Sequence, residues 1–487
     1  MPHRTLPAIA LLLLGRPALA EPACRADGWC WVNPAPQGND LHDVYASSPR
    51  DAWAVGDHGT LLHWDGGRWT PRESGVGERL RAVAGNGPHD VWAVGDLGAA
   101  IHSDGDRWQL RRVPGLPREL GDVWVSPAGH AWAVGGDAVA RWDGSGWTVE
   151  AVPGARFATV WGSADEDVWA GGGEFLRRWD GTHWSDVPLP AFSKQQQATK
   201  PGVARVRGTA RDQMLAIFAS EESDGVPDLE AFAWDGRAWS PLPARFRAAG
   251  GIWALHDLWV PQRDRAWLRL DFSRAPVPPY HFRRADGRWA QEKEHERGLD
   301  GMNPSRLGGA LDGDGWAVGE CGGLARWNGR RWKVVSTNPA TVASQPPDPD
   351  AVHWQSLAGA RLSRDGRELW LSGRWPADEQ GPSRWYRVDL ERRALAAARG
   401  RGGQALPGTE RRELENQAGD RWELRDVGSD PHAATIVRHS IAGAAQPPVA
   451  FPRLRGAYLD AHGAFWGWGD CGTVVTQAAG SRAPAPR

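Results

Sequence analysis

Lysine, cysteine, methionine and tyrosine are all scarce in this sequence, and its interior has no long apolar run. Its 487 residues carry a formal net charge of −2. Lysine occurs only as Lys194, Lys200, Lys293 and Lys333. We expect no nucleic-acid partner, because phosphate binding needs a concentrated basic patch. No internal segment approaches the ~20 apolar residues of a transmembrane helix, so we expect no membrane span.

The four cysteines, Cys24, Cys30, Cys321 and Cys471, include no C-x-x-C pair. The 15 histidines form no cluster with the spacing of metal ligands. The sequence therefore predicts neither a metal nor another cofactor. Four cysteines permit three disulfide pairings, and their spacing alone leaves the choice open.

Patterns that would indicate an enzyme are missing as well. There is no G-x-S-x-G elbow and no H-E-x-x-H helix motif. A sialidase would need an activated tyrosine, and no motif selects one of the four tyrosines. A non-catalytic binding or scaffold function is the prediction, and a glycan-active hydrolase or lyase is the alternative.

The N-terminus has the pattern of an export signal. Arg4 precedes the apolar stretch "LPAIALLLLG", and the small-residue sequence "ALA" ends at Ala20. This order is typical of a signal peptide over residues 1–20 with cleavage before Glu21. The alternative is a buried strand that is never removed. We expect an extracytoplasmic protein that is secreted, periplasmic or exposed on the cell surface.

Tryptophan and glycine are abundant, with 31 and 61 residues respectively. The stretch "DAWAVGDHGTLLHWDGGRWT" begins at Asp51, and close copies begin at Asp90 and Asp314. Self-similarity with a period of about 40 residues indicates a repeat architecture. Aligned on its second predicted strand, the chain has copies at Trp53, Trp92, Trp132, Trp169, Leu215, Trp267, Trp316, Trp370, Trp422 and Trp466.

Each copy contains four short alternating runs, and Asp-Gly recurs between the third and fourth runs. Asp-Gly favours a tight hairpin whose centre needs positive φ. Four antiparallel strands per ~40 residues form one blade of a β-propeller. The sequence predicts an all-β propeller of about ten blades in one domain over residues 21–480, with seven or eight decorated blades as the alternative. Residues 481–487 are expected to form a disordered tail, and the protein is expected to be a monomer.

The last copy, "LRGAYLDAHGAFWGWGDCGTVVTQ", lacks a fourth strand. The segment at residues 28–33 resembles a fourth strand, but the first three strands of a blade do not precede it. We therefore expect residues 28–33 to complete the last blade and remove an open sheet edge. That placement brings Cys30 into the same blade as Cys471, and a disulfide between them is the pairing we favour.

The recurrent residues have both a structural and a functional interpretation. Large aromatic rings can fill the wedges between blades or stack on sugars, and their regular recurrence favours packing. Acidic residues such as Asp57 and Asp96 follow the second strand in most copies. They suggest either a collar of cation ligands or Asx-turns, and their recurrence favours the turns.

The pattern "DVWAVGD.G....WDG..W" resembles a family of exported bacterial β-propeller proteins with WAVG repeats, related in pattern to Asp-box (BNR-like) and Kelch-like propellers. The likeness is strong over residues 41–190 and 305–336 and faint over 203–300 and 350–450. The Asp-box form S-x-D-x-G-x-x-W is not kept, because glycine directly follows aspartate here. The resemblance implies the propeller fold, and it implies a binding or scaffold role less firmly.

Loops between the second and third strands lengthen in three irregular copies, over residues 220–228, 273–279 and 374–382. Long irregular loops in compact domains are often functional. We expect a protein or glycan ligand to bind at this end of the ring, through Asp224, Arg274, Tyr280 and Trp375. Trp375 is the leading candidate, because an exposed aromatic side chain flanked by charges is a common anchor in recognition.

The export signal makes a direct prediction. N-terminal sequencing of the protein from an envelope or secreted fraction should begin at Glu21. A sequence that begins at Met1 in that fraction would contradict the assignment.

Overall fold

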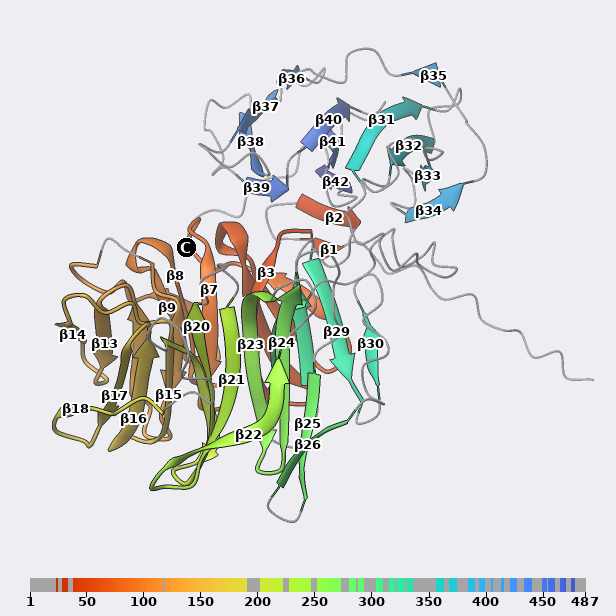
Figure 1. Ribbon diagram of the computed structural model, residues 1–487. Coiled ribbons are helices and arrows are strands. Elements are labelled where there is room, and N and C mark those ends of the chain that lie inside the picture. Colours follow the sequence, from red (N-terminus) through yellow and green to blue (C-terminus); the bar gives the residue numbers. More distant parts are fainter. Residues whose placement is uncertain are drawn as a thin grey trace, which may run out of the picture.

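The computed structural model is an all-β molecule with two single-turn 3-10 elements, η1 (Asp57–Gly59) and η2 (Asp96–Gly98) (Figure 1). It describes residues 38–190 apart from 117–118, the greater part of 202–335, and the strands of 356–477. Near the N-terminus it describes residues 23–24 and 29–33.

Seven four-stranded antiparallel sheets, here called blades 1 to 7, follow one another along the chain. Blade 1 contains β3 (Leu41–Ser48), β4 (Asp51–Gly56), β5 (Leu61–Trp64) and β6 (Trp69–Arg72). Blade 2 contains β7 (Leu80–Gly85), β8 (Val91–Gly95), β9 (Ala100–Ser103) and β10 (Trp108–Leu110). Blade 3 contains β11 (Asp122–Val125), β12 (Ala131–Gly135), β13 (Ala138–Trp142) and β14 (Trp147–Ala151). Blade 4 contains β15 (Thr159–Ala164), β16 (Asp167–Gly172), β17 (Phe175–Trp179) and β18 (Trp184–Asp186).

The remaining blades repeat this order. Blade 5 contains β19 (Gly202–Ala210), β20 (Gln213–Glu221), β21 (Pro227–Trp234) and β22 (Trp239–Phe246). Blade 6 contains β23 (Ile252–Gln262), β24 (Arg265–Phe272), β25 (Tyr280–Ala285) and β26 (Arg288–Glu292). Blade 7 contains β27 (Pro304–Gly309), β28 (Gly315–Gly319), β29 (Gly323–Trp327) and β30 (Trp332–Val334). The four-stranded antiparallel repeat predicted from the sequence is confirmed.

The first strands of these blades form a closed cycle. Each packs on the first strand of the next blade, and β27 of blade 7 packs on β3 of blade 1. The contact needs a glycine, because a Cβ at Gly308 would lie 2.1 Å from the carbonyl oxygen of Val44. Among the described residues the ring therefore closes after seven blades. The prediction of about ten blades is wrong, and its alternative of seven decorated blades agrees with this ring.

Tryptophan rings fill the wedges between neighbouring blades. Trp92 of blade 2 lies with its ring centroid 5.3 Å from that of Trp142 in blade 3. The same contact closes the ring, where Trp316 of blade 7 lies 5.0 Å from Trp64 and 4.9 Å from Trp69 of blade 1. Such rings bury large areas and gain further from edge-to-face contact. The packing interpretation of these recurrent tryptophans is confirmed.

The hairpins between third and fourth strands are held by their aspartates. The Oδ1 atom of Asp143 accepts hydrogen bonds from the N–H groups of Ser145, at 2.8 Å, and Gly146, at 3.0 Å. Gly144 has a φ of 96°, in the region that favours glycine. Equivalent side-chain bonds recur at Asp65, Asp104, Asp180 and Asp235. The predicted hairpin role of Asp-Gly is therefore confirmed.

Three further sheets lie outside the cycle of seven (Figure 1). The first contains β31 (Ser356–Leu362), β32 (Glu368–Arg374), β33 (Arg384–Asp389), β34 (Ala394–Ala398) and β35 (Gln404–Ala405). The second contains β36 (Glu413–Glu415), β37 (Arg421–Asp426), β38 (Ala433–His439) and β39 (Val449–Pro452). The third contains β40 (Leu454–Leu459), β41 (Phe465–Gly469) and β42 (Val474–Gln477). β40 packs on both β31 and β36, so the third sheet contacts the other two.

The N-terminal segment completes the third of these sheets. β2 (Trp29–Asn33) pairs antiparallel with β42, with Trp31 opposite Val475, and β1 (Ala23–Cys24) adds a fifth strand. The predicted pairing of residues 28–33 with the last copy is confirmed, although that copy lies outside the seven-bladed ring. Cys24 stands opposite Cys30 in the register. Cys471 lies outside the described residues, so its disulfide with Cys30 stays a prediction.

A search of the described residues found no helix with the length and apolar character needed to cross a membrane.

Deleting residues 21–36 should lower the melting temperature, because β42 then loses the main-chain bonds and the burial that β2 provides. The measurement is a thermal melt followed by circular dichroism. Deletion of residues 481–487, the predicted tail, is the control and should leave the melting curve in place. An unchanged melt for the 21–36 deletion would show that the strand contributes no stability.

Candidate functional site

The charged residues at the ring axis come from the first strands of the blades. Asp43 on β3, Asp122 on β11 and Asp257 on β23 each reach the first strand of the next blade. Their Oδ2 atoms accept N–H bonds from Val83 at 2.9 Å, Val160 at 2.9 Å and Leu307 at 2.8 Å, respectively. A buried N–H without a partner is costly, so each carboxylate satisfies a neighbouring strand as it joins two blades.

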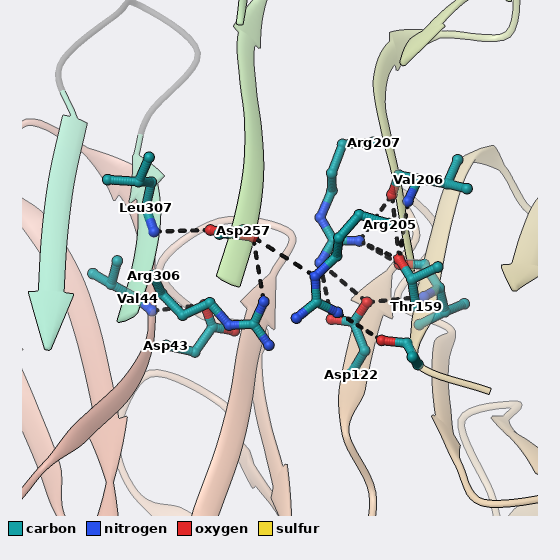
Figure 2. A network of polar contacts seen from close by, with 12 residues as sticks. Asp43, Val44, Asp122, Thr159, Arg205, Val206, Arg207, Asp257, Arg306 and Leu307 are labelled. Atoms are coloured by element: carbon teal, nitrogen blue, oxygen red, sulfur yellow. Dashed lines mark hydrogen bonds and ion pairs between the residues drawn. The ribbon is translucent and has the colours of Figure 1, made fainter. Parts of the chain in front are cut away.

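Three arginines face these carboxylates (Figure 2). Arg207 on β19 donates to Asp122 at 3.0 Å and to the hydroxyl of Thr159 at 2.8 Å. Arg306 on β27 lies 3.3 Å from Asp257, and the Nε atom of Arg205 lies 3.9 Å from the same carboxylate. Three carboxyl groups thus face three guanidinium groups, and with Val83 on β7 the network reaches all seven blades.

Burial is the main electrostatic influence at the axis. It raises the pKa of Asp43 to about 7, although the nearby charge of Arg306 opposes the rise. Burial also raises the pKa of Asp257 to about 6, against the charge of Arg207 and two N–H bonds. Asp122 and Asp257 add to the rise at Asp43 by repulsion between like charges.

An acid with a pKa near 7 is the kind of group that general-acid catalysis uses. The contacts of Asp43 point to a structural role instead. Its Oδ1 atom accepts the N–H of Val44 at 2.9 Å, and its Oδ2 atom accepts the N–H of Val83. Both oxygens are therefore engaged with the main chain on the inner strands, where they position two blades.

A second set of polar contacts lies between the second and third strands. His63 bonds Asp51 at 2.7 Å and stacks on Trp53 with ring centroids 4.2 Å apart. In blade 4 an arginine takes the place of the histidine: Arg178 donates to Asp167 at 2.7 Å. Its guanidinium also lies over Trp169, a cation–π contact. These polar side chains hold the second-strand tryptophans in place.

The acidic residues after the second strand pair with basic residues on or beside a first strand. The Oδ1 atom of Asp57 contacts Nε2 of His42, in its own blade, at 2.6 Å and Nε of Arg79, directly before blade 2, at 2.5 Å. Asp96 pairs with Arg81 of β7, which belongs to the same blade as Asp96. Burial acts to raise the pKa of Asp57, but His42 and Arg79 outweigh it and hold that pKa below its usual value. The Asx-turn interpretation is wrong for these two, because their side chains bond charged neighbours instead of their own turn.

The described part of the chain holds no group of three or more His, Cys, Asp or Glu side chains arranged to bind a metal ion. The expectation of no metal and no cofactor stays a prediction.

Of the residues predicted to contact a ligand, Tyr280 begins β25 and stands opposite Leu268. Asp224, Arg274 and Trp375 lie outside the described residues. The loop at residues 374–382 joins β32 to β33 outside the seven-bladed ring, whereas the other two loops belong to blades 5 and 6, so the three do not lie at one end of a single ring. That these residues contact a ligand stays a prediction.

The sequence analysis missed the axial carboxylates, although the sequence contains a signal for them. One five-residue pattern recurs at the first strands of three blades: leucine, any residue, aspartate, an aliphatic residue, then an aromatic residue. Its copies are "LHDVY" from Leu41, "LGDVW" from Leu120 and "LHDLW" from Leu255. A charged residue at the centre of a strand whose neighbours are apolar indicates a buried polar contact.

No model of a protein family matches the chain, and no curated protein matches it. Solved structures do resemble it. YCF48 from Cyanidioschyzon merolae is 17% identical, with a TM-score of 0.45, over 62% of this chain and 98% of that one. A structure described as YCF48 bound to D1 peptide is 20% identical, with a TM-score of 0.44, over 64% and 99%. The GH74 enzyme of Niastella koreensis is 11% identical, with a TM-score of 0.49, over 89% and 76%. At these identities the likeness concerns the fold alone.

The raised pKa of Asp43 predicts a pH-dependent stability. The folded protein binds a proton on the Asp43 carboxyl group more tightly than the unfolded chain does, because aspartate in an unfolded chain has a pKa of about 3.9. The stabilisation is complete below pH ~4 and is lost as the pH rises through about 7. Urea unfolding of the wild type and Asp43→Asn at several pH values should show the wild type losing a few kcal/mol relative to the variant, since one pKa unit corresponds to ~1.4 kcal/mol.

The difference between the two proteins reports Asp43 together with its repulsion from Asp257, because the hairpin aspartates titrate alike in both. A difference in unfolding free energy that stays constant between pH 4 and pH 8 would contradict a raised pKa at Asp43.

Proposed function

We propose that this protein is a non-catalytic, extracytoplasmic binding or scaffold module for a protein or glycan ligand. The observation that supports it is the use of polar side chains in the regular blades. The described aspartates and arginines at the ring axis form hydrogen bonds to residues of other blades. Between the second and third strands, His63 and His102 bond aspartates next to the second-strand tryptophans. A side chain whose polar atoms already bond other residues of the ring is poorly suited to catalysis.

A binding role places specificity where the blades differ from one another. Blades 1 to 4 repeat one packing scheme, so their shared residues carry little information about a particular ligand. We place the ligand surface on the long loops at residues 220–228, 273–279 and 374–382. Its contact residues are Asp224, Arg274, Tyr280 and Trp375, with Trp375 as the central anchor.

The alternative is a glycan-active hydrolase or lyase, which would need two carboxyl groups free to act on a glycosidic bond. The axial carboxylates do not supply such a pair, since Asp122 and Asp257 are each bonded to an N–H group and an arginine. A turnover assay with polysaccharides and sialosides separates the two functions. Turnover that survives Trp375→Ala but is lost on changing one particular carboxylate would favour the hydrolase.

The binding function is tested with the mature protein on glycan and protein arrays. Short Gly-Ser turns grafted over residues 221–227 and 375–381 should leave the circular dichroism spectrum intact and abolish binding of the ligand that the array identifies. A Gly-Ser graft over the four-residue hairpin at residues 104–107, in a regular blade, is the control and should leave binding unchanged. Binding that persists after both loop grafts would show that the loop surface is wrongly assigned.

A further inference from the structure

The outer strand of each blade is a sheet edge, and blades 1, 3 and 5 differ at one position of it. That position is the second residue after the tryptophan that follows the hairpin. It is occupied by Pro71 in β6, by Pro241 in β22 and by Val149 in β14. Proline has no N–H group and blocks the pairing of a further strand. Blades 1 and 5 thus have protected edges.

The hydrogen-bond register shows which amides of β14 are free. At one end of the β13–β14 pair Asp143 N–H donates to Gly146 C=O, and at the other Val152 N–H donates to Asp137 C=O. Bonded and non-bonded pairs alternate along an antiparallel ladder. Thr148 and Glu150 therefore bond β13, whereas the N–H groups of Trp147, Val149 and Ala151 point away from the sheet.

The edge of β14 lacks the proline, the lysine and the shortness that protect other edges against strand addition, and its one charged residue is Glu150. It spans five residues, Trp147–Ala151, with no proline and no basic residue. In comparison, β30 contains Lys333, and β10 has only three residues before Arg111 and Arg112. Natural edges are blocked by proline, by lysine or by shortness. β14 is instead long enough and regular enough to accept another strand.

The side chains of this edge are exposed and include an aliphatic one. Thr148, Val149, Glu150 and Ala151 are all exposed to solvent. Val149, Leu110 and Leu97 are the exposed large hydrophobic residues of the described chain, and all three belong to blades 2 and 3. An exposed β-branched residue beside a free amide offers both a main-chain and a side-chain contact to an extended peptide.

The charge of the edge indicates the composition of that peptide. The hairpin and outer strand of blade 3, residues 143–151, contain Asp143 and Glu150 and no basic residue. The neighbouring strand β18 ends in Asp186, whose side chain is 83% exposed. Arg177 pairs with Glu150 at 2.9 Å and with Asp186 at 3.0 Å. Three carboxylates therefore have one arginine among them, and the remaining negative charge would attract lysine or arginine on the incoming strand.

The chain itself shows that a blade of this type accepts a fifth strand. β1 pairs with the outer edge of β2, which is the fourth strand of its sheet. We propose that the free edge of β14 binds an extended, basic peptide segment of a partner protein, which adds a fifth strand to blade 3. This surface is separate from the loops of the proposed function, and its test needs none of the ligands sought there.

The test uses a fluorescein-labelled peptide of about eight residues that alternates valine and lysine, a length that covers a five-residue edge. Fluorescence anisotropy should show binding to the wild type and about tenfold weaker binding to Val149→Pro, which loses a free amide and gains a steric block. Pro71 and Pro241 show that the ring accommodates proline at this position. Val149→Thr keeps the amide and should bind within about threefold of the wild type, because threonine also favours strands.

Leu110→Pro is the matched control on blade 2, at the same position after the hairpin tryptophan. The bond from Arg111 N–H to Ala100 C=O gives Leu110, which stands opposite Ile101, an outward amide by the same alternation. This variant should bind the peptide as the wild type does. Amide hydrogen exchange should slow at Val149 and Ala151 when the peptide is bound.

Two altered peptides separate strand addition from simple charge attraction. A version with every amide N-methylated keeps its charge but cannot form the ladder, and a version with glutamate in place of lysine keeps the ladder but reverses the charge. Neither should bind. Failure of the valine–lysine peptide to bind, retained binding of the methylated peptide, or equal affinity for Val149→Pro would each overturn the proposal.

Discussion

The structure depends on one contact that every regular wedge uses, in which the second-strand tryptophan of one blade meets the hairpin aromatics of the next. Trp92, Trp169 and Trp267 all make it, and Trp316 makes it with blade 1 to close the ring. A blade cannot bury this tryptophan alone, so its stability is shared with its neighbour. The spacing of tryptophans in the sequence follows from this requirement, since one aromatic layer must be rebuilt in each blade.

The charged side chains at the ring axis also join neighbouring blades, at the narrow inner side of the wedges. Space there is too small for large side chains, and Gly308 shows how closely two first strands approach. Aspartates reach across this gap and satisfy the next strand, and arginines from other blades balance their charge. Buried charges are tolerated when they are paired and hydrogen-bonded in this way. The result is a ring with aromatic packing outside and ion pairs within.

Because contacts between blades hold the ring together, the residues available for binding are those that do not pack between blades. The turns and outer edges are such positions, and they vary from blade to blade while the tryptophans recur. Pro71 and Val149 occupy the same place on their blades, yet one closes the sheet edge and the other leaves it open. A single residue thus decides whether a blade presents an outward amide at this position, while the pairing within the blade stays the same.

The sequence by itself determined the features whose causes are local. Asp143-Gly144 predicts its hairpin because positive φ and the bonds of the aspartate lie within four residues, and the strand repeat follows from alternation over short distances. Pairing of residues 28–33 with the last copy was also readable, because each segment lacked what the other supplied. The number of blades was decided by tertiary structure, since closure depends on Gly308 meeting Val44 across more than 260 positions. The axis was decided there as well, because Asp122 and Arg207 are 85 residues apart and become partners only when the first strands of blades 3, 4 and 5 stand side by side.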